Sequence, residues 1–141
     1  MPYTAPGNYL SAIAEHADEC EVDLAKLKAI ASERSWHRLD ELAAQRALQV
    51  LIEACIGVAK HWCKAETRQV STEALQSFKR LHEAGVIGST ENWRKMIGLR
   101  NALVHDYLEI DDGIILSVVQ NDYYQEPLAF IRSAIKALKQ P

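Results

Sequence analysis

The stretch RALQVLIEACIGVAKHW, residues 46–62, decides what kind of fold this sequence adopts. On a helical wheel of about 100° per residue, its polar residues gather within roughly 60° of one another: Arg46, Gln49, Glu53 and Lys60. Nearly every other residue between Ala43 and Trp62 is apolar, so such a helix shows only a narrow stripe to water or to a polar cleft. A helix over about residues 36–64 is therefore predicted to be the central helix of the core.

Helical patterns continue on both sides of this segment. Proline occurs only at positions 2, 6, 127 and 141, so it interrupts nothing between residues 7 and 126. Apolar residues at helical spacing predict one long or slightly broken helix over 8–31. A third helix is predicted to begin at Ser71 as its N-cap and to end at Gly85, because glycine suits the left-handed position after a helix.

The last third of the chain predicts two more helical segments. One begins at about residue 90 and reaches about residue 107. The other follows the junction Asp111-Asp112-Gly113, ends near residue 138 and is broken near residues 122 and 127.

The composition agrees with a folded, purely helical protein. The chain has 141 residues, of which 48% are hydrophobic and 25% are charged, a balance typical of globular domains and not of disordered ones. We expect a single all-α domain over residues 1–141, with residues 1–8 flexible. Its predicted architecture is an antiparallel helical bundle of four main helices plus a broken C-terminal helix.

Charge and hydropathy limit the partners of this protein. The net charge of −3 provides no general attraction for polyanions, so nucleic-acid binding would need a local basic patch. The residues available for such a patch are Arg94, Lys95, Lys79 and Arg80. The longest apolar run, about residues 47–59, contains Gln49 and Glu53 and is shorter than the ~18–20 residues of a membrane helix.

The cysteines and the first residues predict a cytoplasmic protein. The start MPYTAPGNYL lacks the basic and apolar regions of a signal peptide. Cys20, Cys55 and Cys63 are odd in number and form no CxxC pair, so we expect buried, reduced thiols. Core packing is a better interpretation of His61 beside these cysteines than metal binding, and we expect neither a metal nor a cofactor.

The predicted helix over 90–107 carries an anomaly in RNALVHDY, residues 100–107. Its apolar stripe on the wheel is made by these residues: Trp93, Met96, Ile97, Leu103, Val104, Tyr107 and Leu108. Arg100 falls inside this stripe, where an unpaired charge costs several kcal/mol. Arg100 therefore either pairs with a carboxylate such as Glu53 or Asp40, or snorkels outward, or is held in a cleft or subunit interface to meet an anion.

Arg100 and His105 form a combination that suits phosphodiester chemistry. A guanidinium stabilises charge on a phosphate, and an imidazole that titrates near neutral pH moves a proton on or off a ribose hydroxyl. Five residues on one α-helix, however, separate the two side chains by about 140°. The two groups meet only if the helix loosens near its end, if Arg100 reaches around it, or if a second copy of the helix lies across a two-fold axis.

The spacing Arg100-x4-His105-x-Tyr107 resembles the R-x4–6-H motif of HEPN domains, in the R-x4-H-x-Y form of the HepT toxins. Residues 46–62 look like the central helix of these toxins, FKRLHEAGVI (78–87) looks like the segment before their motif helix, and LEID (108–111) resembles the sequence after the motif. The likeness covers about residues 9–138.

The resemblance implies a toxin that is a metal-independent endoribonuclease and a homodimer. Motif helices of two subunits would face each other across a cleft, and the 2′-hydroxyl of the RNA would attack the adjacent phosphorus. His105 would act as general base or acid, and Arg100 would stabilise the phosphorane. Asn101 and Asp106 match polar positions of the family motif, and supporting roles are implied for them.

The resemblance also implies a partner, an MntA-like nucleotidyltransferase antitoxin that transfers AMP to the motif tyrosine, here Tyr107. Tyr107 is seven residues from Arg100 and about 20° away on the wheel, so a bulky anion on it would sit at the cleft mouth. The alternative function is a non-catalytic HEPN module that docks and regulates a nucleotidyltransferase, which the acidic balance favours.

Overall fold

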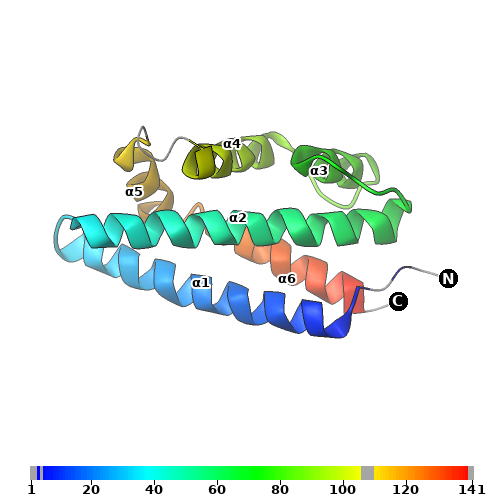
Figure 1. Ribbon diagram of the computed structural model, residues 1–141, viewed down its shortest axis with the longest axis horizontal. Coiled ribbons are helices and arrows are strands. Elements are labelled where there is room, and N and C mark those ends of the chain that lie inside the picture. Colours follow the sequence, from blue (N-terminus) through cyan, green and yellow to red (C-terminus); the bar gives the residue numbers. More distant parts are fainter. Residues whose placement is uncertain (1–2, 4, 106–109, 140–141) are drawn as a thin grey trace.

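The computed structural model describes residues 3, 5–105 and 110–139, and these residues form helices and turns without a strand. The six helices are α1 (Gly7–Glu33), α2 (Arg38–Thr67), α3 (Ala74–Glu83), α4 (Glu91–His105), α5 (Asp112–Gln120) and α6 (Gln125–Lys139). Figure 1 shows α1, α2 and α6 packed side by side, with α3 and α4 along another side of α2. The predicted all-α bundle with a broken C-terminal helix is confirmed.

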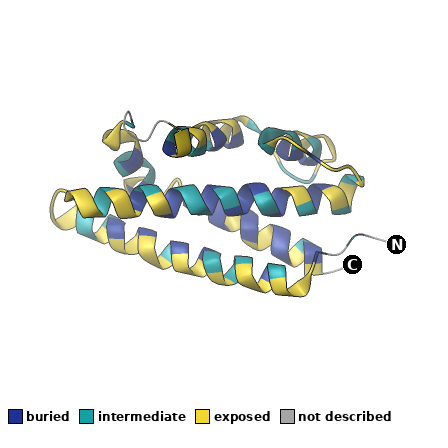
Figure 2. Cartoon of the chain, viewed as in Figure 1, coloured by how far each residue is buried: buried dark blue, intermediate teal, exposed yellow. Residues whose placement is uncertain are grey.

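Helix α2 is the centre of the bundle, as its sequence predicts. It contacts each of the other five helices, and dark buried residues recur along its whole middle in Figure 2. Leu51, Cys55 and Val58 are completely buried. Among the described residues α2 alone is long and apolar enough to cross a membrane, but 56% of its most apolar stretch lies inside the bundle, which is the position of a core helix.

The C-terminal end of α3 lies where the sequence predicts it, whereas its N-terminal end does not. Gly85 has a φ of +77° directly after the helix, as predicted for a C-terminal glycine. Ser71 is not the N-cap, because α3 begins only at Ala74. The Ser71 hydroxyl is instead buried and accepts a hydrogen bond from Arg80 at 3.3 Å, so it serves the connection between α2 and α3.

The break between α5 and α6 lies where the sequence predicts it. Asp122 has a φ of 59°, which ends the preceding helix, and Lys28 pairs with its carboxylate at 2.8 Å. Pro127 occupies the first turn of α6, where proline removes no helical hydrogen bond. This turn carries Tyr123 and Tyr124, which line a pocket together with residues of α2.

Within residues 1–8, the segment expected to be flexible, Tyr3 and Ala5 contact the bundle. Helix α1 already begins at Gly7, and Ala5 is 3% exposed. The Tyr3 hydroxyl is hydrogen-bonded to Nδ1 of His61, and the two rings are stacked. Aromatic contacts therefore join Tyr3 and Tyr9 to His61 of α2.

Candidate active site

Aromatic packing fixes the first half of α4, which carries the candidate residues. Trp93 is buried, stacks on Phe78 of α3 with ring centroids 4.3 Å apart and meets Phe130 of α6 edge-on at 4.7 Å. Ile97 and Leu103 are buried on the same side. Val104, expected in this stripe, is 41% exposed, whereas its neighbour Leu103 in the same turn is buried.

Arg100 is half-buried on the side of α4 that faces the core. Its Nε atom is buried and has no hydrogen-bond partner among the residues that the structure describes. Trp62 Nε1 and Ser77 Oγ are also buried without a hydrogen-bond partner among those residues, but these groups are neutral, whereas the Arg100 guanidinium is charged. An unpaired buried donor costs about 1–3 kcal/mol, and more when it is charged.

Neither carboxylate that could neutralise Arg100 does so. Glu53 accepts a hydrogen bond from Gln49 at 3.2 Å, one turn away on α2. Asp40 accepts from Arg34 at 2.9 Å and from the backbone N–H of His37 at 2.8 Å, and these contacts lower the pKa of its carboxyl group. In the described part of the chain the internal salt bridge, one of the alternatives for Arg100, is therefore not formed.

His105 and Asn101 are exposed on the last two turns of the same helix. Because α4 stays helical from Glu91 to His105, the side chains of Arg100 and His105 point about 140° apart and their Cα atoms differ by about 7.5 Å along the axis. One copy of α4 does not bring the two groups to one atom. Asp106 and Tyr107 lie outside the described residues, and their roles stay predictions from the sequence.

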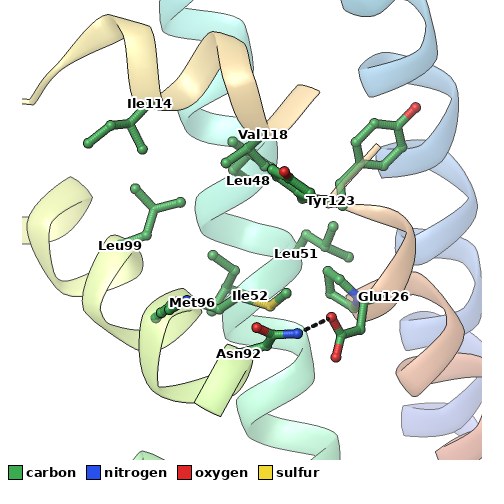
Figure 3. Close-up of a pocket in the computed structure, with 13 residues that line it drawn as sticks. Leu48, Leu51, Ile52, Asn92, Met96, Leu99, Ile114, Val118, Tyr123 and Glu126 are labelled. Carbon is green, nitrogen blue, oxygen red and sulfur yellow. Dashed lines mark hydrogen bonds between the residues drawn. The ribbon is translucent and has the colours of Figure 1, made fainter. Parts of the chain in front are cut away.

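A cleft of about 440 Å³ opens beside the first half of α4. Figure 3 shows its floor on α2 and its walls on α4 and on α5 with the start of α6. Most of its lining is apolar: Leu48, Leu51, Ile52, Met96, Leu99, Ile114 and Val118. At one end the Asn92 side-chain amide donates a hydrogen bond to Glu126 at 3.0 Å.

The family is decided by comparison with known proteins. The family model described as Ribonuclease HepT-like matches residues 13–135. This chain belongs to the HepT-like family.

Named relatives of the HepT-like chain are a nuclease and two toxins. The chain is 37% identical over 76 residues to the mRNA nuclease HepT of Shewanella oneidensis, an alignment that spans 52% of this chain and 57% of that relative. A tri-AMPylated HEPN toxin of the same organism, solved with its MNT antitoxin, is 26% identical, with 94% of this chain and 99% of that one covered and a TM-score of 0.79. A mutant MntA–HpeT toxin–antitoxin pair is also 26% identical, with coverage of 93% and 99% and a TM-score of 0.77.

The basic residues of the HepT-like chain do not all join one patch. Arg80 donates to the carbonyl oxygen of Val70 at 3.0 Å and is tied to the connection before α3. Lys95 is 71% exposed and lies 3.9 Å from Glu91, a distance that leaves its ammonium group accessible. Arg94 and Lys79 are exposed. Three of the four predicted positions therefore remain available for an anionic ligand.

Sequence reasoning missed the cleft of the HepT-like chain. The sequence patterns single out neither Asn92 nor Glu126, and Tyr123 with Tyr124 is the aromatic pair expected at a helix boundary. The two tyrosines do lie at the turn before α6, but both line the cleft; Tyr124 is buried and Tyr123 is 58% exposed. The one signal in the sequence for this cleft was the apolar pair Met96 and Leu99, which widens the apolar stripe of α4 on one side.

The three cysteines are buried, as predicted. Burial raises the pKa of Cys55 well above its ordinary value and that of Cys20 to about 11, so both thiols stay protonated at neutral pH. His61 is surrounded by Tyr3, Tyr9 and Lys64, and burial followed by the charge of Lys64 lowers its pKa. These groups belong to the packing of the bundle.

Proposed function

We propose that this protein is the toxin of a toxin–antitoxin pair and acts as an endoribonuclease in the cytoplasm. The observation that carries the proposal is Arg100, a half-buried cation whose Nε has no partner among the described residues, with an exposed histidine five residues later on the same helix. Membership of the HepT-like family and the relative named as an mRNA nuclease support RNA as the substrate.

The proposed reaction uses groups of the RNA itself as nucleophile and leaving group, with no metal. The 2′-hydroxyl oxygen attacks the adjacent phosphorus, and the bond from phosphorus to the 5′-oxygen of the next nucleotide breaks. His105 takes the proton from the 2′-hydroxyl or gives one to the 5′-oxygen, and Arg100 stabilises the charge on the phosphorane. The products are a 2′,3′-cyclic phosphate and a 5′-hydroxyl end.

The proposed site belongs to a homodimer. The divergence of about 140° between Arg100 and His105 on an intact α4 supports a site that takes the arginine of one copy and the histidine of the other. A two-fold axis beside α4 then makes two equivalent sites. Asn101, exposed one residue after Arg100, has a supporting role in the proposal, as has Asp106.

The proposed control of the toxin is AMP transfer to Tyr107 by an MntA-like nucleotidyltransferase. The tyrosine oxygen attacks the α-phosphorus of ATP, and pyrophosphate leaves. The similar toxin solved in tri-AMPylated form with its MNT antitoxin supports this control. An AMP group would add negative charge and bulk two residues from His105, where an RNA phosphate would otherwise bind.

The ribonuclease is tested with wild-type protein, His105→Ala and the matched control His82→Ala. His82 is an exposed histidine at the end of α3, outside the proposed site. We expect wild type and His82→Ala to arrest growth on induced expression and to leave cyclic phosphate ends on RNA, and His105→Ala to do neither. If all three proteins behave alike, the proposal is wrong.

The modification is tested separately by incubating the protein with its nucleotidyltransferase and ATP. We expect one or more AMP units on the peptide that contains Tyr107, found by mass spectrometry, and none on Tyr107→Phe. AMP confined to Tyr123 or Tyr124 contradicts the assignment.

A further inference from the structure

The cleft beside α4 is a built pocket that the proposed reaction does not use. Its volume of about 440 Å³ lies within the range of small-ligand sites, about 300–1,000 Å³. Ile52 of α2, Met96 of α4 and Val118 of α5 face it from three elements (Figure 3). A flat apolar or aromatic group entering from solvent would be covered on both faces by such walls.

Polar groups converge at one end of this cleft. The hydrogen bond of 3.0 Å between Asn92 Nδ2 and Glu126 Oε2 uses one amide hydrogen and one carboxylate oxygen. The Asn92 amide holds the Glu126 carboxylate at the opening, and the two oxygens of this carboxylate are acceptors that lie side by side on one group. Oε1 has no hydrogen-bond partner among the described residues, and Oε2 keeps a further lone pair. Both residues are exposed, so a ligand can reach these acceptors from solvent.

A cation stands at the same opening. Lys95 lines the cleft, and its ammonium group is 3.9 Å from Glu91, with both side chains more than 70% exposed. Such a loose ion pair contributes little to stability and is easily exchanged for another anion. The opening therefore offers two acceptors and one free positive charge around an apolar interior.

We propose that this cleft binds an unpaired guanine base of the RNA that the protein cleaves. Guanine is the base whose Watson–Crick edge places two donors side by side, N1–H and the N2 amino group, and these match the two oxygens of the Glu126 carboxylate. The apolar walls and the exposed ring of Tyr123 cover the faces of the base, as in other single-strand RNA sites. Lys95 then pairs with the phosphate of that nucleotide.

The position of the cleft connects it with the proposed reaction, on which this inference rests. Asn92 and Arg100 are on the same helix, eight residues or about 12 Å apart along its axis. Even at the spacing of about 3.4 Å per nucleotide that a strand has in a duplex, RNA covers this distance in a few nucleotides. The guanine would therefore lie at a constant offset from the cleaved phosphate and determine where the strand is cut.

Binding is tested first, without any cleavage, by titrating the protein with the four 5′-mononucleotides in an NMR experiment. We expect wild type to bind the guanosine nucleotide about tenfold more tightly than the other three, the discrimination of one good polar pair. Glu126→Gln, which replaces an acceptor oxygen with a donor, should lose this preference. The control Glu91→Gln makes the same charge change one residue from Asn92, outside the cleft, and should retain the preference.

Cleavage is tested next by sequencing the ends made from a random RNA pool. We expect wild type and Glu91→Gln to enrich guanine at one fixed offset from the cut, and Glu126→Gln to lose the enrichment. Equal binding of the four nucleotides, or cleavage with no guanine at any offset, overturns the inference. If wild type cuts no more RNA than His105→Ala, the proposed function fails, while the nucleotide titration still decides the cleft.

The sedimentation of the same variants distinguishes the other occupants of an apolar cleft. We expect wild type, Glu91→Gln and Glu126→Gln to sediment alike. Dissociation of a dimer by Glu126→Gln alone would show that a second copy of the chain fills the cleft. Loss of antitoxin binding with an unchanged nucleotide preference would show that a protein partner fills it, and either result overturns the inference.

Discussion

Arg100 on α4 and Arg132 on α6 are the same residue type in opposite settings. Arg132 donates to Asp18 at 3.0 Å and to both carboxylate oxygens of Glu21 at 3.0 and 3.1 Å, so it joins α6 to α1 at the surface. Arg100 is half-buried and has a buried Nε without a partner in the described part of the chain. The fold accounts for the first arginine through its ion pairs, whereas it leaves the second with a buried donor that has no partner among the described residues, which the proposed function assigns to the binding of an anion.

The largest effect is expected from replacing Arg100, the arginine without a carboxylate partner among the residues that the structure describes. Arg100→Ala should slow RNA cleavage by about 10²–10³-fold, the usual loss when a charge-stabilising donor is removed from an active site. Its melting temperature should be unchanged or slightly higher, because an unpaired buried donor disappears. Cleavage rates and thermal melts measure the two effects. Arg132→Ala is the matched control and should cleave RNA at the wild-type rate; a large loss of stability in Arg100→Ala would reveal a structural partner.

Mixing two inactive variants tests whether the arginine of one copy works with the histidine of the other. Arg100→Ala and His105→Ala, unfolded and refolded together at equal amounts, should form mixed dimers in half of the population, each with one intact site of two. The mixture should then regain roughly a quarter of the wild-type cleavage rate. Each variant refolded alone should stay inactive. A mixture as inactive as its parts would place both groups in one chain.

Replacing Arg132 tests the other side of the comparison. Arg132→Ala should lower the free energy of unfolding by about 0.5 kcal/mol, because exposed ion pairs contribute little. Arg132 lowers the pKa of Glu21, chiefly through the hydrogen bond between them. A carboxylate with a lowered pKa stabilises the folded state above its ordinary pKa, and this stability is lost as the pH falls through the lowered value. Urea unfolding at pH 7 and below about pH 4 should therefore show a difference between wild type and Arg132→Ala only at the higher pH.

His61 is a third polar group to set beside the two arginines; it is half-buried, and the effect expected from replacing it is the smallest. Burial and then Lys64 lower its pKa in the folded state, so the unfolded chain takes up a proton first as the pH falls. Stability should decrease from pH 7.5 to pH 5.5 in wild type and decrease less in His61→Phe, as measured by the melting temperature. Tyr3, Tyr9 and Lys64 face this histidine, and Tyr9→Phe, which keeps the ring beside it, should retain the pH dependence. Parallel pH profiles for wild type and His61→Phe would contradict this account.

The helices were predictable because their signals are local. The apolar run of α2, the glycine after α3 and the break before α6 each depend on residues within a turn or two of one another. The prediction that Ser71 is the N-cap of α3 was wrong because it also used a local signal, a serine shortly before an acidic residue. The contact that engages it comes from Arg80, nine residues later.

The candidate site was predictable only as an anomaly. The periodicity of α4 placed Arg100 in the apolar stripe, and this position is confirmed by its half-buried side chain. Whether Glu53 would reach it was open, because one glutamate has several rotamers and a nearer partner in Gln49. No pattern indicated that Asn92 and Glu126, 34 residues apart, would close one end of a cleft.

The sequence by itself therefore determined the helical class, the central place of α2 and the residue that does not fit the stripe of α4. These features follow from the 3.6-residue period, which is a property of neighbouring residues. Only the tertiary structure decided which cations find carboxylates and where a cleft remains. Arg132 pairs with Glu21, which is 111 residues away in the sequence. Such a contact depends on how whole helices pack, because charge pairing and burial are decided where the surfaces of different helices meet.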